Sequence, residues 1–123
     1  MNRVRILLVE DDALIGVLLG EMLTGMGFAV CAIEATESAA VLAAVQHKPD
    51  LIIADATLAQ GSGLSAVDRI LRTGPVAHLF TSGDGLRVKL AKPAAVVLQK
   101  PFDEAALADA IRRALDQVAM VDG

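Results

Sequence analysis

Acidic side chains and one lysine follow the short apolar runs of this sequence, where strands are expected to end. The first run is followed by Glu10, Asp11 and Asp12, the third by Asp55 and the fifth by Lys100. Carboxylates can bind a divalent cation or act as nucleophiles toward phosphate. Each residue also has an ordinary role, since an acidic residue before a helix often caps it and a strand-end lysine is usually a solvated charge.

The charge balance of this group favours a cation. If Glu10, Asp11, Asp55 and Lys100 share one pocket, its net charge is about −2, and two like charges about 4 Å apart at an effective dielectric of 20 repel by about 4 kcal/mol. Mg²⁺ prefers one or two carboxylates together with waters and phosphate oxygens. The group therefore favours a divalent cation such as Mg²⁺ in this pocket.

Alternating strands and helices are expected to position these residues. Short runs rich in Val, Ile and Leu predict strands at 4–9, 29–33, 51–54, 76–80 and 95–98. Apolar residues at helical spacing predict helices at 13–26, 38–47, 64–72 and 103–118. The apolar stripes of the first two are Leu14, Leu18 and Met22, and then Val41, Leu42 and Val45. The last helix is expected to start at an Asp103 cap.

This alternation favours a doubly wound α/β fold with a parallel sheet covered on both faces. The carboxyl ends of parallel strands meet at one edge, so the candidate residues are expected there. Segment 83–94 contains Gly83, Gly85 and Pro93, which leaves at most a two-turn fourth helix. We expect a single domain over residues 1–123, with its core at about 4–118.

Composition excludes several other classes of protein. The 123 residues are 54% hydrophobic, carry a net charge of −4 and include neither Trp nor Tyr. A chain without basic runs or aromatic stacking platforms is not expected to bind nucleic acid. No apolar run reaches the roughly 18 residues of a membrane span, and a lone Cys31 cannot form an intrachain disulfide. We expect a cytoplasmic protein without a membrane segment.

Four motifs in order carry a resemblance to a known family. They are LLVEDD at 7–12, DLIIAD at 50–55 with Gly63 eight residues after Asp55, FTS at 80–82, and LQKPF at 98–102. Together they resemble the receiver domain of two-component response regulators. The resemblance implies a flavodoxin-like sheet with strand order 2-1-3-4-5 and a regulator rather than an enzyme.

The resemblance also implies a role for each matching residue. Asp55 would be the phosphoacceptor, phosphorylated by a sensor histidine kinase or a histidine phosphotransfer protein, and Thr81 and Lys100 would contact phosphoryl oxygens. The implied Mg²⁺ ligands are Glu10, Asp11, Asp55 and the backbone carbonyl of Thr57. With few residues after the predicted fifth helix, no output domain is expected, so the protein would dock on a partner or relay phosphate.

Three departures from the family pattern bear on switching. Ala59 stands where a proline is common and is expected to loosen its loop, and Val97 replaces the usual aromatic. The segment before Lys100 is short, similar to the stand-alone receivers of the alphaproteobacterial stress-response subgroup. Switching is therefore expected to involve segment 83–94 rather than rotation of an aromatic ring.

Two other interpretations stay open at this point. A pseudo-receiver would bind a partner without phosphorylation, although it usually lacks one of the acidic, hydroxyl or lysine residues, and all are present. Residues 61–66, GSGLSA, fit a dinucleotide-binding fingerprint. That motif belongs on the first strand–helix turn, which here is acidic and would repel a pyrophosphate.

Overall fold

A five-stranded parallel sheet forms the centre of the molecule. The computed structural model describes residues 3–122, with side chains for 3–119, so residues 1, 2 and 123 of the predicted domain lie outside it. The strands are β1 (Arg5–Val9), β2 (Ala29–Glu34), β3 (Leu51–Asp55), β4 (Ala77–Ser82) and β5 (Val97–Gln99). Their order in the sheet is β2-β1-β3-β4-β5, and every neighbouring pair is parallel. The predicted doubly wound, flavodoxin-like fold is confirmed.

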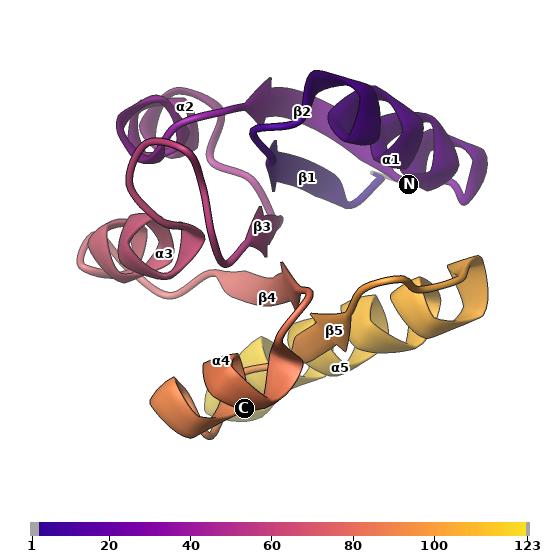
Figure 1. The fold of residues 1–123 in the computed structure, drawn as a ribbon. Coiled ribbons are helices and arrows are strands. Elements are labelled where there is room, and N and C mark those ends of the chain that lie inside the picture. Colours follow the sequence, from indigo (N-terminus) through magenta and orange to yellow (C-terminus); the bar gives the residue numbers. More distant parts are fainter. Residues whose placement is uncertain (1–2, 123) are drawn as a thin grey trace.

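Helices cover both faces of this sheet. They are α1 (Ala13–Gly25), α2 (Glu37–His47), α3 (Gly63–Leu71), α4 (Gly85–Ala91) and α5 (Glu104–Asp122). In Figure 1 the strands run in a column from β2 to β5, with α2 and α3 on its left and α1 and α5 on its right. The central strands β1, β3 and β4 lack in-and-out alternation because both of their faces are covered.

Alternate strand residues supply two separate cores. On the α1/α5 face, Ile6, Leu8 and Ile53 pack with Leu107 and Ile111 of α5. On the face of α2, α3 and α4, the core includes Leu7, Ile52, Ala54, Ala66 and Phe80. Burial of one such Leu or Ile side chain contributes about 1.5–3 kcal/mol to the stability of the fold. These cores hold the strand ends, and the residues that follow them, at fixed positions.

The predicted apolar stripes of the first two helices are mostly exposed, although Val41 of α2 packs against the core. Leu14 and Leu18 of α1 are 67% and 55% exposed, and Leu42 and Val45 of α2 are 57% and 59% exposed. The residues buried against the sheet are instead Gly16, Leu19, Gly20 and Leu23 of α1 and Ala40, Ala43 and Ala44 of α2. Small residues let a helix backbone approach the sheet closely, which a count of large apolar side chains does not detect. The helices are present, but rotated.

Helix starts are capped by side chains, as the sequence predicted for two of them. Asp12 accepts a hydrogen bond from the Ile15 N–H at 3.1 Å, and Asp103 accepts one from the Ala106 N–H at 2.8 Å. The fourth helix has only 7 residues, which confirms the expected short segment. By contrast, α5 continues to Asp122 rather than ending near 118, because residues 119–122 contain no Gly or Pro to stop it.

The loop between β3 and α3 closes tightly on the end of β3. The N–H of Gly63 donates to the carbonyl of Ala56 at 3.1 Å. A Cβ at Gly63 would overlap the backbone carbonyl of Asp55. Glycine at this position therefore allows the start of α3 to lie directly against the phosphoacceptor candidate.

We predict that Gly63→Ala destabilises the protein, whereas Gly25→Ala does not. The added methyl group at Gly63 meets backbone that must shift, which costs about 1–3 kcal/mol. A Cβ at Gly25, the last residue of α1, meets nothing within 4 Å, so alanine there should be neutral or stabilise by up to about 1 kcal/mol. Urea unfolding followed by circular dichroism measures both changes, and equal stabilities of the two variants would contradict the close approach.

Candidate functional site

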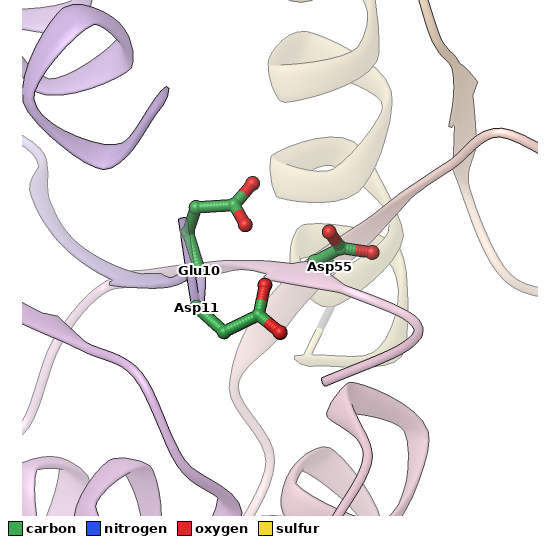
Figure 2. A group of neighbouring side chains, drawn as sticks. All are labelled: Glu10, Asp11 and Asp55. Carbon is green, nitrogen blue, oxygen red and sulfur yellow. The ribbon is translucent and has the colours of Figure 1, made fainter. Parts of the chain in front are cut away.

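Three carboxylates from two strand ends meet at the carboxyl edge of the sheet. Glu10 and Asp11 directly follow β1, and Asp55 is the last residue of β3, which pairs with β1. Each offers an oxygen, and these atoms all lie within 4.8 Å of one another. Figure 2 shows the three carboxylate groups gathered around one space. Residues 45 positions apart in the chain thus form one acidic cluster, which has the oxygen donors that a hard divalent cation prefers.

Lys100 supplies the positive charge beside this cluster. Its Nζ lies 2.7 Å from Oδ2 of Asp55 and 3.5 Å from Oε1 of Glu10. The Lys100 backbone N–H donates to the carbonyl of Ser82 at 2.8 Å, which fixes the start of the side chain at the end of β4. One ammonium group against three carboxylates leaves an excess of negative charge of about two units.

Burial and mutual contacts shift the pKa values of two of these groups. Glu10 is 6% exposed, and burial raises the pKa of its carboxyl group, although the Asp12 N–H and Lys100 oppose the shift. For Lys100, burial acts to lower the pKa of the ammonium, but the hydrogen bond and charge of Asp55, assisted by Glu10, outweigh it and raise the pKa overall. The lysine therefore stays charged while it holds Asp55.

Backbone N–H groups orient all three carboxylates. The N–H of Asp12 donates to Oε2 of Glu10 at 3.1 Å, and that of Thr57 donates to Oδ1 of Asp55 at 3.2 Å. The N–H of Ala59 donates to Oδ2 of Asp11 at 2.7 Å. A proline at position 59 would have no such N–H. Ala59 therefore ties its loop to Asp11 instead of loosening it as the sequence suggested.

Two hydroxyl side chains end β4, and they line different cavities. Thr81, the register partner of Asp55, lines a cavity of about 440 Å³ together with Glu10 and Lys100. Ser82 lines a second cavity, of about 470 Å³, together with Thr57, and its Oγ accepts from the Asp84 N–H at 2.9 Å. Both side chains are buried. The sequence indicated Thr81 as the hydroxyl group that contacts a phosphoryl oxygen. The structure offers Ser82 as a second candidate for that contact.

The comparisons with known proteins decide the family. The response regulator receiver domain model matches residues 6–112. The chain belongs to the response regulator receiver family. It is 35% identical over 114 residues to the phyllosphere-induced regulator PhyR of Methylorubrum extorquens, a match that covers 89% of this chain and 43% of that protein. This relative is a regulator by name.

Solved receiver structures share the same fold. The receiver domain of PhyR from Erythrobacter litoralis superposes with a TM-score of 0.83 at 30% identity, covering 94% of this chain and 92% of that one. PhyR from Bartonella quintana, described as an anti-anti-sigma factor, gives 0.87 at 27% identity over 99% of this chain and 51% of that one. The receiver thus spans about half the length of the PhyR proteins from M. extorquens and B. quintana.

In β5, Val97 stands where the family usually has an aromatic residue. The side chain of Gln99, two residues later, contacts the start of α4. The side chain of Gln99 accepts from the Gly85 N–H at 2.7 Å and donates to the Gly83 carbonyl at 2.7 Å. Val97 packs against the core on the same face. Sequence reasoning missed Gln99 because a glutamine at a strand end is common. The one feature of the sequence that could have indicated a role for Gln99 is its position directly before Lys100.

Two further observations concern the dinucleotide-binding motif and membrane spans. Residues 61–66 lie after β3 and its loop, and the Ser62 side chain caps α3 by accepting from the Ser65 N–H at 3.0 Å, so the dinucleotide fingerprint is not on the first strand–helix turn. Within residues 3–122, no helix combines the length and the apolar character needed to cross a membrane.

Proposed function

We propose that Asp55 accepts a phosphoryl group in a two-component or phosphorelay pathway. The observation that carries the proposal is the position of its carboxylate, which contacts the Lys100 ammonium at 2.7 Å and faces Glu10 and Asp11 within one cluster. Phosphoryl transfer needs mainly positioning and neutralisation of charge. The cluster positions Asp55, and Lys100 together with a bound divalent cation would neutralise the phosphoryl oxygens. A pseudo-receiver that never accepts phosphate is not better supported, because every residue type that the reaction requires is present.

The acidic cluster fits Mg²⁺. We propose that Glu10, Asp11 and Asp55 hold the ion through carboxylate oxygens, with the backbone carbonyl of Thr57 as the fourth protein ligand. All are hard oxygen donors, and the three carboxylates already lie within 4.8 Å of one another. When bound, Mg²⁺ would offset the negative charge of the cluster and of the phosphoryl oxygens.

The side chains of the receiver then have separate tasks. A carboxylate oxygen of Asp55 forms a bond to phosphorus while the bond between phosphorus and the donor breaks. The electron pair of the broken bond leaves with the donor group. The Lys100 ammonium, which contacts Asp55 before the transfer, neutralises one of the phosphoryl oxygens afterwards. The Thr57 N–H, at 3.2 Å from Oδ1, keeps the carboxylate in one orientation before the transfer.

We predict that acetyl phosphate with Mg²⁺ adds one phosphoryl group to the parent protein and none to Asp55→Asn. The amide is not a nucleophile toward phosphorus, although its shape preserves the fold. Intact mass spectrometry measures the added mass, with Asp109→Asn on the outer surface of α5 as the matched control that stays reactive. Labelling of Asp55→Asn to the parent level would move the phosphoacceptor elsewhere, and an unlabelled parent would favour the pseudo-receiver.

A hydroxyl group at the end of β4 is proposed to donate to a phosphoryl oxygen, and Thr81 is the candidate that the sequence indicated. It shares a cavity with Lys100 and Glu10, whereas Ser82 shares one with Thr57. We predict that Thr81→Ala slows labelling by acetyl phosphate about 10-fold, less than the roughly 100-fold or greater cost of losing an oxyanion-hole donor. Ser82→Ala, measured in the same time course, is the matched variant. If Ser82→Ala is the slower of the two, the role belongs to Ser82.

The exposed face of α1 is proposed to receive the phosphodonor, a sensor histidine kinase or a histidine phosphotransfer protein. A donor must cover Asp55 to reach it, and the cavity beside Lys100 and Glu10 continues over Ile15, Leu18 and Met22 of α1. Large apolar side chains exposed next to a reactive group are typical of a protein-binding surface. Because this face borders the site, a partner bound there can place its phosphohistidine at Asp55.

We predict that Leu18→Ser abolishes labelling by a protein donor and leaves labelling by acetyl phosphate unchanged. The small donor needs no docking surface, whereas the protein donor loses apolar contact area. Phosphorylated kinases and phosphotransfer proteins from the same genome serve as donors, and Leu42→Ser on α2, with 57% exposure against 55% for Leu18, is the control. An equal loss of transfer in both variants would argue against docking on α1.

The output is proposed to be a change in binding to a partner protein. PhyR from Bartonella quintana is described as an anti-anti-sigma factor, a name that denotes action on another protein. In this receiver, segment 83–94 is the candidate for the change, because Lys100 and Gln99 connect the phosphoryl site to α4 through neighbouring residues.

A further inference from the structure

The loop that follows Asp55, residues 56–62, is closed by its own backbone. Thr57 forms an antiparallel bridge with Ser62, and the Gly63 N–H donates to the Ala56 carbonyl at 3.1 Å. The two ends of the loop therefore move together. Because Thr57 lies on one side of this bridge, its carbonyl is positioned by whatever holds Ser62 on the other.

Glu37, the first residue of α2, is what holds Ser62. Its Oε1 accepts from the Ser62 N–H at 3.1 Å, and its Oε2 accepts from Oγ of Ser65 at 2.8 Å and from Nη1 of Arg69 at 3.1 Å. Its own backbone N–H donates to the Gln60 carbonyl at 3.2 Å. Four hydrogen bonds from one residue thus join α2, the loop and α3.

The loop packs closely against the side chain of Glu37. Gly61 has a φ of +81°, and a Cβ added there would lie 2.5 Å from Cβ of Glu37. The side chain of Glu37 is only 17% exposed. The Ser65 hydroxyl, the Ser62 N–H and Arg69 lower the pKa of its carboxyl group, so it remains an ionised acceptor at neutral pH.

We propose that Glu37 is a positioning residue of the magnesium site: through Ser62 it holds the bridged Thr57 and so presents the Thr57 carbonyl to the ion. The inference rests on the proposed function, because it assigns a role toward the same site. Glu37 itself lies outside the acidic cluster, so its effect passes through the loop backbone. Groups outside the ligand set that fix the position of a ligand commonly change metal affinity when they are removed.

The loop has other attachments to the site: the Ala59 N–H donates to Asp11, the Thr57 N–H donates to Asp55, and the Ala56 N–H donates to the Thr81 carbonyl. These bonds fasten the middle of the loop and its Thr57 end, whereas the side chain of Glu37 accepts from the Ser62 end. Without the Glu37 side chain, Ser62 and Ser65 lose their hydrogen bonds to α2, while the apolar packing of α2 against α3 remains. The carbonyl of Thr57 must then be ordered when the ion binds, and the entropy cost of ordering appears as weaker binding.

Calorimetric titration of the full chain with Mg²⁺ tests this proposal. Glu37→Ala should bind Mg²⁺ about 10-fold more weakly than the parent. Glu37→Asp, which keeps the charge but is one methylene shorter, should show a smaller loss. Glu104→Ala is the matched control, because Glu104 is also the first residue of a helix, but is exposed and lies on α5. Its affinity should equal that of the parent.

Carbonyl ¹³C NMR of Thr57 separates positioning from general stability. In the parent, saturation with Mg²⁺ should shift this signal to a single sharp position, and in Glu37→Ala the signal should be broadened or shifted less. A lower melting temperature with parent-like Mg²⁺ affinity would show a purely structural role and overturn the proposal. If Glu37→Ala does not fold, parent-like affinity of Glu37→Asp overturns it in the same way. A parent that binds no Mg²⁺ instead refutes the proposed metal site, which is a distinguishable outcome.

Discussion

Repulsion among Glu10, Asp11 and Asp55 is the constraint around which the rest of the site is organised. Their oxygens lie within 4.8 Å of one another, and Lys100 places a compensating full charge against Asp55 and Glu10. The two cores fix the strand ends from which these residues extend, and so bring the three carboxylates together. Each carboxylate also accepts a backbone N–H, which lowers the cost of burying charge. A cation beside the three carboxylates would relieve this repulsion.

The loop after Asp55 obtains its rigidity from hydrogen bonds rather than from a proline. Ala59 contacts Asp11, and Glu37 contacts the far end of the loop from a different helix. Gly63 allows α3 to begin against the carbonyl of Asp55. Three attachments from three elements thus converge on one short segment. A loop with this many contacts presents its backbone groups in one conformation, which is what binding a metal through a carbonyl requires.

On the other side of the site, α4 is short but well connected. Gln99 bridges Gly83 and Gly85, and Lys92 pairs with Asp68 of α3 at 2.8 Å. Lys89 donates to the carbonyls of Pro93 and Ala95. These contacts depend on polar side chains that can be exchanged for water at little cost, in contrast to a buried aromatic ring. The segment is therefore suited to rearrange when Lys100 changes partner.

The sequence by itself determined the order of strands and helices, the short fourth helix and the meeting of Glu10, Asp11, Asp55 and Lys100 at one edge. These follow from local periodicity and from the rule that parallel strands end on the same side. Only the tertiary structure decided which faces of α1 and α2 are buried, where Thr81 and Ser82 point, and that Ala59, Glu37 and Gln99 act on the loops of the site. Helix rotation depends on how closely small residues approach the sheet, and the contacts of these three residues join positions 14 to 48 apart in the chain. No local pattern encodes such contacts, because they exist only after the chain has packed.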